Sequence, residues 1–349
     1  MSIPAVRPWP ERDLEAVPNC PVCGSDKRAL LYQDLTDRVF GFADGTWNLY
    51  RCAHCGGAYL DPRPTPLSIG RAYAGYYTHQ TQDHPIVRRK GLPRTLLHDS
   101  INGYQNWRYG LKRSPSSPLG RWLLLVIPPL RSAADAECRH LPPLPPGGGR
   151  LLDVGCGNGG FLMLAQQAGW QVEGLDFDAD AVLTARSRGL TVRHGGTEVL
   201  DGEHDRFDVI TLCHVIEHVH DPRSVLCRLH SLLKPGGTLW LDTPNLDSLG
   251  SRRFRANWRD LDPPRHLVIF TASSLRKALR DSGYSAIHQH WRGMSVFEVY
   301  AASEAIARSG TAKGGSYRGR PPMHAIAAEL REMMQPARRE FLTVSAKKG

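Results

Sequence analysis

The sequence lacks a long apolar run. In a chain of 349 residues the longest such run is WLLLVIPPL from Trp122, which two prolines interrupt and which is too short to span a bilayer. The first residues, MSIPAVRPWPERD, contain no apolar stretch of signal-peptide length. We therefore expect a cytoplasmic protein without a transmembrane segment.

The sequence also lacks a long segment of like charge. The net charge is +10, but Lys and Arg are scattered along the chain, apart from short clusters such as Arg88-Arg89-Lys90. This balance permits an anionic partner without demanding one. The length allows a sizeable core and is typical of about two domains.

Cysteine is scarce outside two short motifs. The chain has eight cysteines, and in the reducing compartment expected here they are thiols or metal ligands rather than disulfides. Four are isolated, whereas the other four form two C-x2-C pairs in the stretches CPVCG and CAHCG. These four are Cys20, Cys23, Cys52 and Cys55.

The two cysteine pairs predict a structural zinc site. A C-x2-C turn followed by glycine, here Gly24 or Gly56, lets two thiolates converge on one metal, and two such turns complete a tetrahedral shell. The 28 residues between the pairs include ALLYQDL and TWNLYRC, which are typical of strands. We predict a zinc ribbon over residues 14–66 that folds around Zn²⁺ and does no chemistry; the alternative is four unrelated thiols. His54, inside the second turn, is interpreted as a spectator.

The middle of the chain carries fewer signals. Residues 67–146 are predicted to form a helical linker or cap, because TLLHDSINGYQNWRYGL from Thr95 has a helical pattern. The Pro- and Gly-rich stretch HLPPLPPGGGR then marks a boundary, and a further domain is expected over residues 147–349.

Strand and helix patterns alternate in this last domain. RLLDVG, QVEGLD, LTVRHG, FDVITLCHV and GTLWLDTP are typical of strands, and helical apolar spacing recurs between them. A helix over TASSLRKALRDSG opens with a Thr cap and faces Leu275, Ala278 and Leu279 inward. The alternation predicts an α/β fold with a doubly wound parallel sheet. A ligand is expected at the carboxyl ends of its strands.

The stretch LLDVGCGNGG, at the end of the first of these strands, has the pattern of a nucleotide-binding loop. Gly155, Gly157 and Gly160 satisfy G-x-G-x-x-G, which alone suits NAD as well as S-adenosylmethionine. Asp176 ends the second strand, where a carboxylate accepts hydrogen bonds from the ribose of either ligand. Asp153 lies just before the glycines and suits a ligand with an ammonium group and no pyrophosphate. The two acids together favour S-adenosylmethionine.

Four motifs in order resemble class I S-adenosylmethionine-dependent methyltransferases, especially the ubiquinone-type and sugar methyltransferases. They are LLDVGCGNGGFL, GLDFD, FDVITLCHVIEHVHDP and LLKPGGTLWLDTPN, and the resemblance covers residues 150–291. It implies a seven-stranded Rossmann-like sheet whose last two strands, GYSAIHQHW and REFLTVSAKK, pair antiparallel. Cys156, between two glycines, is interpreted as a small packing residue beside the cofactor. The implied cofactor-binding residues are Asp153, Gly155, Cys156, Gly157, Gly159, Asp176, Phe177, Thr197 and Cys213.

Methyl transfer from a sulfonium requires few catalytic side chains. A sulfonium methyl is already electrophilic, so the protein aligns a nucleophile and, for a hydroxyl or carbon acid, removes a proton. HVIEHVHDP places His214, Glu217 and His218 just after the fourth strand. His218 and Glu217 are both candidate bases, with a structural role in this segment as the alternative, and His214 is a candidate substrate contact. Sugar C-methyltransferases that this chain resembles use a histidine here.

A second candidate segment, WRDLDPPRHLVIF, follows the fifth strand. Its prolines hold Arg265 and His266 on a short rigid stretch, and Trp258 is expected to wall a pocket. His266 is a candidate base or substrate contact, with a histidine satisfied by backbone as the alternative. The predicted substrate contacts are therefore His214, Asn245, Trp258 and Arg265.

An insertion separates the last two expected strands. Residues 294–337 contain two helical stretches, near 295–308 and 322–334, around the Gly-rich SGTAKGGSYRGR. An insertion at this place lies over the active-site edge, and we expect a lid or a homodimer contact, with a disordered basic loop as the alternative.

Two classes of function follow from these patterns. The first is methylation of an oxygen or carbon of a small molecule, such as a sugar, polysaccharide or lipid precursor or a secondary metabolite, in biosynthesis. The second is an rRNA or tRNA methyltransferase that grips RNA through the zinc ribbon. The few Lys and Arg of the ribbon are balanced by Asp, and no Asn-Pro-Pro-aromatic motif follows the fourth strand, so nucleic acid is disfavoured. A cofactor-binding subunit without activity is disfavoured by the intact glycines and acids.

Overall fold

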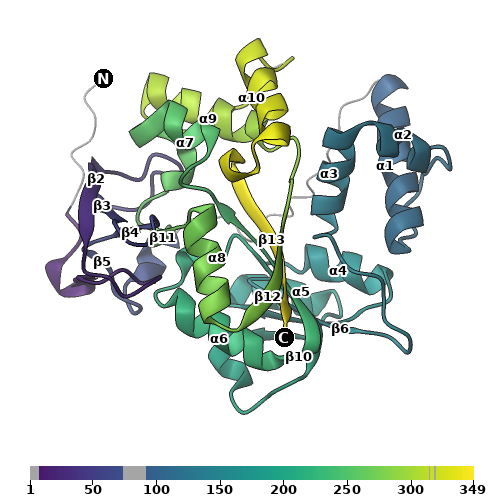
Figure 1. Cartoon of the computed structure of the whole chain (residues 1–349), viewed down its shortest axis with the longest axis horizontal. Coiled ribbons are helices and arrows are strands. Elements are labelled where there is room, and N and C mark those ends of the chain that lie inside the picture. Colours follow the sequence, from purple (N-terminus) through teal and green to yellow (C-terminus); the bar gives the residue numbers. More distant parts are fainter. Residues whose placement is uncertain (1–7, 74–91, 314, 318–319) are drawn as a thin grey trace.

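A computed structural model of the chain describes residues 8–73, 92–313, 315–317 and 320–349. The basic cluster at residues 88–90 lies outside this range. The α/β part contains the large central sheet, and a strand-rich N-terminal part and a helical part pack beside it (Figure 1). Of the helices within the described ranges, none combines the length and the apolar character needed to cross a membrane.

The central sheet has seven strands in the order β12-β13-β10-β9-β6-β7-β8. Strands β10, β9, β6, β7 and β8 are mutually parallel, whereas β13 is antiparallel to both β10 and β12. This arrangement confirms the predicted doubly wound α/β fold, including the antiparallel last pair. The bounds are β6 (Arg150–Val154), β7 (Gln171–Asp176), β8 (Val192–His194), β9 (Phe207–Cys213), β10 (Leu233–Pro244), β12 (Tyr284–His290) and β13 (Phe341–Lys348).

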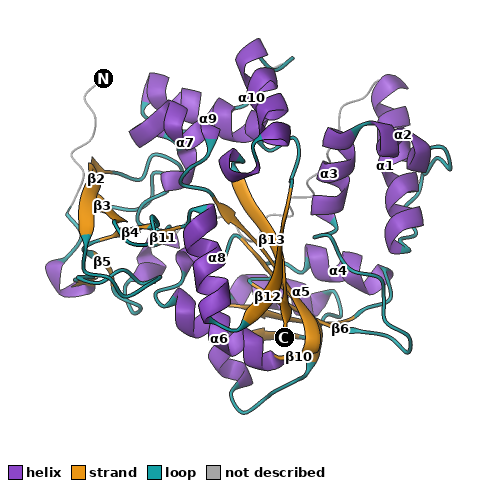
Figure 2. Ribbon diagram, in the orientation of Figure 1, coloured by secondary structure: helices purple, strands orange, loops and turns teal. Residues whose placement is uncertain are grey.

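Helices cover both faces of this sheet, as Figure 2 shows. Apolar side chains of α6 and α8 join one core cluster, and those of α4 and α5 join a second cluster. Strands covered on both faces need apolar residues at successive positions, which explains the buried run in β9 and β10. The bounds are α4 (Gly160–Gln167), α5 (Ala179–Ser187), α6 (Pro222–Leu232) and α8 (Ala272–Asp281).

The N-terminal part is a small antiparallel sheet that the α/β part completes. Strands β2 (Arg28–Leu35), β3 (Trp47–Cys52) and β4 (Ala58–Leu60) pair in order, and β11 (Val268–Ile269) adds a fourth strand beside β4. A two-stranded sheet, β1 (Leu14–Glu15) with β5 (Arg63–Pro64), flanks it. The apolar core is continuous across both parts. The ribbon therefore packs as an extension of the α/β part.

The helical cap is a hairpin of α1 (Leu92–Tyr109) and α2 (Gly120–Val126), followed by α3 (Pro128–Glu137). Two glycines allow the close approach within it. A Cβ on Gly103 would lie 1.8 Å from Ser117 O, and a Cβ on Gly120 would lie 2.0 Å from Ser100 O. Because no side chain fits at either point, the two glycines define how α1 and α2 pack.

The predicted insertion forms two packed helices, α9 (Val296–Ser309) and α10 (Met323–Met334). They share an apolar cluster with α7 (Leu249–Phe254), and Figure 1 shows them beyond one end of the sheet. Part of the Gly-rich stretch between them, residues 314 and 318–319, lies outside the described ranges. The two helices thus stand where the sequence predicts them, and their role as a lid or dimer contact stays a prediction.

Candidate functional site

The four cysteines of the ribbon converge on one point. Cys20 Sγ lies 3.6 Å from Cys55 Sγ, Cys23 Sγ lies 3.6 Å from Cys52 Sγ, and all four sulfurs lie within 4.8 Å of one another. Sulfurs about 2.3 Å from a tetrahedral Zn²⁺ are separated by about 3.8 Å, so this set fits zinc. His54 is exposed and is not part of the cluster, as expected for a spectator.

A glycine with positive φ closes each cysteine turn. Gly24 has φ +76° and its N–H donates to the Cys20 carbonyl at 2.8 Å. Gly56 has φ +80° and donates to the Cys52 carbonyl at 3.1 Å. Any other residue would be strained in this conformation, which explains why a glycine follows each pair.

The glycine loop folds back from β6 onto β7. The N–H groups of Gly155 and Cys156 both donate to the Leu175 carbonyl, at 2.8 and 3.0 Å. Cys156 is buried in the core between α4 and the sheet, and its Sγ lies 2.6 Å from where a Cβ on Gly174 would stand. Burial raises the pKa of the Cys156 thiol, so it is a protonated packing group.

Asp153 lies at the carboxyl end of β6 with no exposed surface. Its Oδ1 accepts hydrogen bonds from Thr211 Oγ1 at 2.8 Å and from Arg139 Nη1. Its Oδ2 has no hydrogen-bond partner among the described residues. A buried carboxylate oxygen without a partner is costly, and it is the group that an ammonium or its bound water would satisfy.

Arg139 is a site residue that the sequence does not reveal. It follows α3 with φ +48°, and its guanidinium also donates to Thr211 Oγ1 at 2.9 Å and lies 3.9 Å from the Phe161 ring centroid. The sequence around Arg139 contains no recognisable motif. The packing of the helical cap alone brings Arg139 to Asp153.

Asp176 ends β7 beside the glycine loop. Its Oδ2 accepts from the Gly157 N–H at 2.7 Å and its Oδ1 from the Asp178 N–H at 2.9 Å. Both bonds orient the carboxylate, and burial raises its pKa. The next side chain, Phe177, is 71% exposed. An exposed aromatic ring at this edge is available to cover a flat base.

The remaining predicted cofactor residues lie at the same edge of the sheet. Thr197 begins a short 3-10 helix (Thr197–Leu200), and a Cβ on the preceding Gly196 would stand 2.5 Å from Phe177 Cζ. Cys213 ends β9 and is half-buried. Burial raises the pKa of Cys213 to about 11, so it too is a neutral thiol at neutral pH.

Glu217 is the most enclosed of the candidate bases. It has no exposed surface, and its two oxygens bind His214 Nδ1 at 3.2 Å and Thr243 Oγ1 at 2.9 Å. Burial raises the pKa of Glu217, but the hydrogen bond from His214 and the nearby histidines outweigh it, and the pKa is lowered to about 2. Glu217 is thus an ionised carboxylate that holds His214 in place.

His218 is oriented by the backbone of the neighbouring segment. Its Nδ1 lies 3.0 Å from the Arg265 carbonyl oxygen and 3.0 Å from Tyr73 Oη. A carbonyl only accepts, so Nδ1 carries the proton and Nε2 keeps its lone pair. Burial, followed by the charge of nearby His266, lowers the pKa of His218 to about 4. The imidazole is therefore neutral at neutral pH and is able to accept a proton.

His266 packs against His218, with the two ring centroids 4.8 Å apart. It is 7% exposed, and its Nδ1 donates to the Asp260 carbonyl at 2.7 Å. The structure thus shows the backbone-satisfied histidine that the sequence left as an alternative. It forms one side of the surroundings of His218.

Two further groups complete this region, and the sequence does not single them out. Tyr73 reaches His218 from the segment after the ribbon. Arg292, after β12, donates to His214 Nε2 at 2.9 Å and to Asp242. His214 is thereby held between a carboxylate and a guanidinium, with its side chain 34% exposed. Both ring nitrogens are engaged by these partners, and the role of His214 as a substrate contact stays a prediction.

Two predicted substrate contacts are buried and engaged elsewhere. Trp258 is 2% exposed, and its Nε1 donates to Glu340 Oε2 at 3.3 Å. Asn245 has no exposed surface, and its Nδ2 donates to the carbonyls of Ala337 and Arg339. We therefore assign structural roles to both residues in place of the predicted contact with substrate.

Arg265 also departs from its predicted role. It has no exposed surface and donates to Asp37 Oδ1 at 2.6 Å, to Asp262 Oδ2 at 3.0 Å and to the Ala72 carbonyl at 2.9 Å. Asp37 belongs to the ribbon part and Asp262 to the α/β part. Arg265 therefore ties the two parts together and has no surface for a substrate.

Replacing Arg265 with Met is expected to destabilise the chain by about 3–5 kcal/mol, because it leaves two carboxylates buried without their cation. Urea unfolding measures this change. The matched control is Arg252→Met, whose guanidinium is 57% exposed and whose removal should cost less than about 1 kcal/mol. Equal losses in the two variants would contradict the structural role of Arg265.

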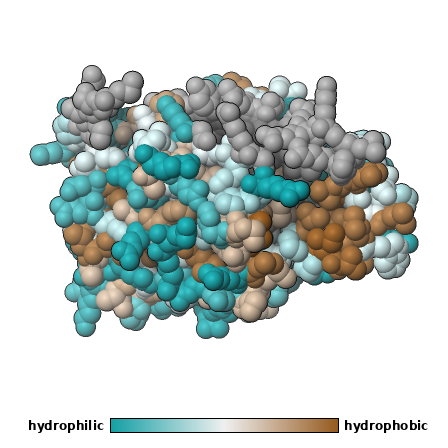
Figure 3. Space-filling view, turned by 90° about the horizontal axis from the view of Figure 1, so that it is seen from above, coloured by the Kyte–Doolittle hydropathy of each residue, from teal (hydrophilic) through white to brown (hydrophobic). Residues whose placement is uncertain are grey.

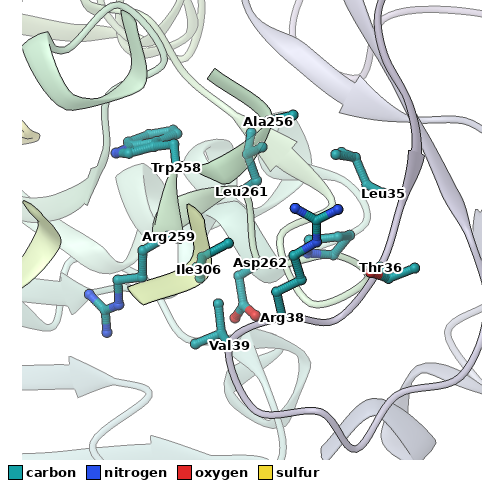
Figure 4. Close-up of a pocket in the computed structure, with 11 residues that line it drawn as sticks. Leu35, Thr36, Arg38, Val39, Ala256, Trp258, Arg259, Leu261, Asp262 and Ile306 are labelled. Atoms are coloured by element: carbon teal, nitrogen blue, oxygen red, sulfur yellow. The ribbon is translucent and has the colours of Figure 1, made fainter. Parts of the chain in front are cut away.

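A small pocket, open to solvent and with a cavity volume of about 10 Å³, lies where the ribbon meets the α/β part (Figure 4). Leu35, Thr36 and Arg38 line it from the ribbon, and Leu261 and Asp262 line it from the other side. The Asp262 carboxylate is bound by Arg265. Trp258 lines it too, as the sequence predicts for the wall of a pocket, but none of the predicted base or cofactor residues does. We therefore interpret the pocket as a seam between the two parts.

The sheet order, and the glycine loop between β6 and β7, agree with the class of protein that the sequence motifs resemble, the doubly wound methyltransferases. Residues 130–289 match the model of a family described as a methyltransferase domain. The match covers 160 of the 349 residues and confirms the predicted resemblance to methyltransferases.

Part of the chain is also similar to curated proteins. The ubiquinone biosynthesis O-methyltransferase of Methylococcus capsulatus is 40% identical over 105 residues, which are 28% of this chain and 44% of that protein. The enzyme of the same name from Cereibacter sphaeroides is 40% identical over 119 residues, 32% of this chain and 48% of that protein. The chain thus spans about half the length of the curated relatives it matches.

Solved structures resemble the chain more distantly. An S-adenosylmethionine-dependent methyltransferase from Mesorhizobium loti is 21% identical, with a TM-score of 0.42, over 62% of this chain and 97% of that one. Phosphoethanolamine N-methyltransferase 2 from Haemonchus contortus is 16% identical, with a TM-score of 0.45, over 83% of this chain and 62% of that one.

Proposed function

We propose that this chain transfers a methyl group from S-adenosylmethionine to an oxygen of a small-molecule, glycan or lipid-precursor acceptor in biosynthesis. The observation that carries the proposal is the pair of acids flanking the glycine loop, with Asp153 Oδ2 buried and unpartnered among the described residues and Asp176 fixed by the Gly157 amide. The names of the curated relatives support oxygen as the acceptor atom.

The residues around the loop fit the cofactor by the chemistry of their donors and acceptors. Asp153 would face the ammonium group, and Asp176 would accept from the ribose hydroxyls. Phe177 would cover the adenine, with Thr197 and Cys213 beside it. Only glycine fits at position 155, since a Cβ there would stand 2.4 Å from Val215 Cγ2, whereas the space beside Gly157 is open and would admit the methionine part.

His218 is the proposed general base. When bound, S-adenosylmethionine supplies an electrophilic methyl group, so the acceptor hydroxyl has to lose its proton as the new bond forms. Nε2 of His218 keeps the lone pair that takes this proton, because the Arg265 carbonyl holds Nδ1 protonated. His214, fixed by Glu217 and Arg292, is the proposed contact that orients the acceptor.

The ribbon is proposed to hold one structural Zn²⁺ through its four cysteines. Its support is the convergence of the four sulfurs within 4.8 Å of one another and the burial of Cys20, Cys52 and Cys55. Four thiolates leave no open position for chemistry, so the metal would fix the ribbon. The ribbon in turn supplies Asp37 to Arg265, whose carbonyl orients His218.

Replacing Asp176 with Ala is expected to weaken binding of S-adenosylhomocysteine at least about tenfold, because the two ribose hydrogen bonds to a charged acceptor are lost. Isothermal titration calorimetry measures the affinity. Asp201→Ala is the matched control, since Asp201 is a surface acid whose side chain is 76% exposed. Unchanged affinity in Asp176→Ala, or no binding by the unmodified chain, would overturn the proposed cofactor site.

A further inference from the structure

The helical cap presents an apolar stripe to solvent. Leu119, Trp122, Leu123 and Val126 follow the i, i+3, i+4, i+7 spacing of one helical face, the face that a globular protein normally buries. Here the four side chains are 73%, 59%, 40% and 75% exposed. The opposite side of α2 is the buried one, since Leu124 has no exposed surface. Figure 3 shows a brown, hydrophobic area on the same side of the molecule as the cap.

The stripe lies in a stretch without any acid. Residues 100–134, between Asp99 and Asp135, contain five Lys or Arg and no Asp or Glu, a net charge of +5 that is spread over most of α1, the turn of the hairpin, α2 and the first part of α3. Arg121 lies next to the stripe, with its guanidinium 4.9 Å from the Trp122 ring centroid. The five cations are Arg108, Lys112, Arg113, Arg121 and Arg131, and of these Arg113 is paired with Glu137 of α3 at 2.7 Å.

The apolar stripe, together with the five cations, here called the cationic rim, indicates what kind of surface could cover it. A second copy of the same surface would bring two sets of like charges together, which opposes self-association. An anionic lipid bilayer offers an apolar interior for the leucines, an interface that favours the Trp122 indole, and negative charge for the rim. We propose that the cap, through α2, docks this chain on an anionic membrane surface.

The cap is joined to the candidate site. Arg139, directly after α3, donates to Asp153 beneath the glycine loop, and Ser132 of α3 donates to the Trp291 carbonyl beside Arg292. The part of the chain that would dock is thus packed against the candidate site through α3 and Arg139. The docking itself does not depend on the proposed methyl transfer.

Vesicle flotation of the full chain tests the proposal. The probes are phosphatidylcholine vesicles and vesicles in which a third of the lipid is phosphatidylglycerol. We expect binding to the anionic vesicles that falls as salt rises, and little binding to the neutral ones. Trp122→Glu combined with Val126→Glu should lower the partition coefficient at least about tenfold. Leu183→Glu on α5, which replaces a leucine that is 61% exposed, is the matched control.

The charged rim is tested separately with Arg121→Glu, which should weaken binding to anionic vesicles and reduce its salt dependence. This variant keeps the test decisive if the double variant does not fold. Absence of vesicle binding, or equal binding by unmodified chain and folded variants, overturns the proposal. So does a dimer, seen by light scattering, that Trp122→Glu dissolves. Binding of S-adenosylhomocysteine should be unchanged in all these variants, so failure of docking and failure of the proposed function are separate results.

Discussion

Replacement of His218 with Asn is expected to lower kcat by about 10²- to 10⁴-fold, the range that a positioned general base contributes. Asn keeps a polar group near the Arg265 carbonyl but has no lone pair at the place of Nε2. Affinity for S-adenosylhomocysteine should stay close to that of the unmodified chain, because His218 is not among the proposed cofactor contacts. Methyl transfer to an acceptor hydroxyl, followed with labelled cofactor, measures the change.

The pH dependence separates a base from a structural histidine. Only the neutral imidazole accepts a proton, and burial lowers the pKa of His218 to about 4. The acidic fall of kcat/KM is therefore expected near pH 4, well below the value of about 6.5 for an ordinary histidine. Above that limb the neutral form is fully populated, and the rate should no longer depend on this group. The Asn variant should lack the limb.

The control for this prediction is His204→Asn, at an exposed position away from the site. It should leave both rate and pH profile unchanged. If His218→Asn retains nearly full kcat, or loses activity only in proportion to lost folded protein in a thermal melt, His218 is not the base. In that case His266→Asn, which alters the neighbouring ring, becomes the informative variant.

Replacement of Cys52 with Ser is expected to remove the metal and to lower the melting temperature by more than about 10 °C. Structural zinc contributes about 10–16 kcal/mol in isolated zinc-finger peptides, and in a larger chain even a part of this is a large loss. The ribbon core is continuous with the core of the α/β part, so its loss reaches beyond the ribbon. Metal analysis and thermal unfolding measure the two effects.

Cys227→Ser is the matched control for the zinc prediction, since Cys227 is exposed and lies outside the cluster. It should keep one zinc per chain and the melting temperature of the unmodified protein. Metal analysis that finds far less than one zinc in the unmodified chain would contradict the site. So would a Cys52→Ser variant that retains the metal and its stability.

Much of the α/β part is predictable because its signals are local. Apolar runs such as FDVITLC and alternating strand and helix patterns fix the elements, and parallel connection rules leave few ways to arrange them. Glycines in the loop and in the cysteine turns indicate backbone conformations with positive φ, which other residues avoid. The spacing of each cysteine pair is also a local signal, and the four cysteines converge as that spacing indicates.

The candidate site was harder to predict than the fold. Trp258, Asn245 and Arg265 carry side chains typical of substrate contacts, yet the structure uses them to satisfy buried carbonyls and carboxylates. Sequence shows which groups have donors and acceptors, but not where their partners lie. Arg139 and Tyr73 illustrate the converse, because each reaches the site from a segment without a motif.

The sequence by itself determined the sheet, the glycine loop, the acids at 153 and 176 and the cysteine set, because each depends on local periodicity or fixed spacing. Only the tertiary structure decided that Val268–Ile269 completes the ribbon sheet, that Arg265 joins Asp37 across 228 residues, and that the stripe on α2 faces solvent. Those features depend on which surfaces meet when the parts pack. The pattern of residues along the chain shows that a face is apolar or charged, but not which surface it packs against. That choice is determined by the free energy of burying one surface against another.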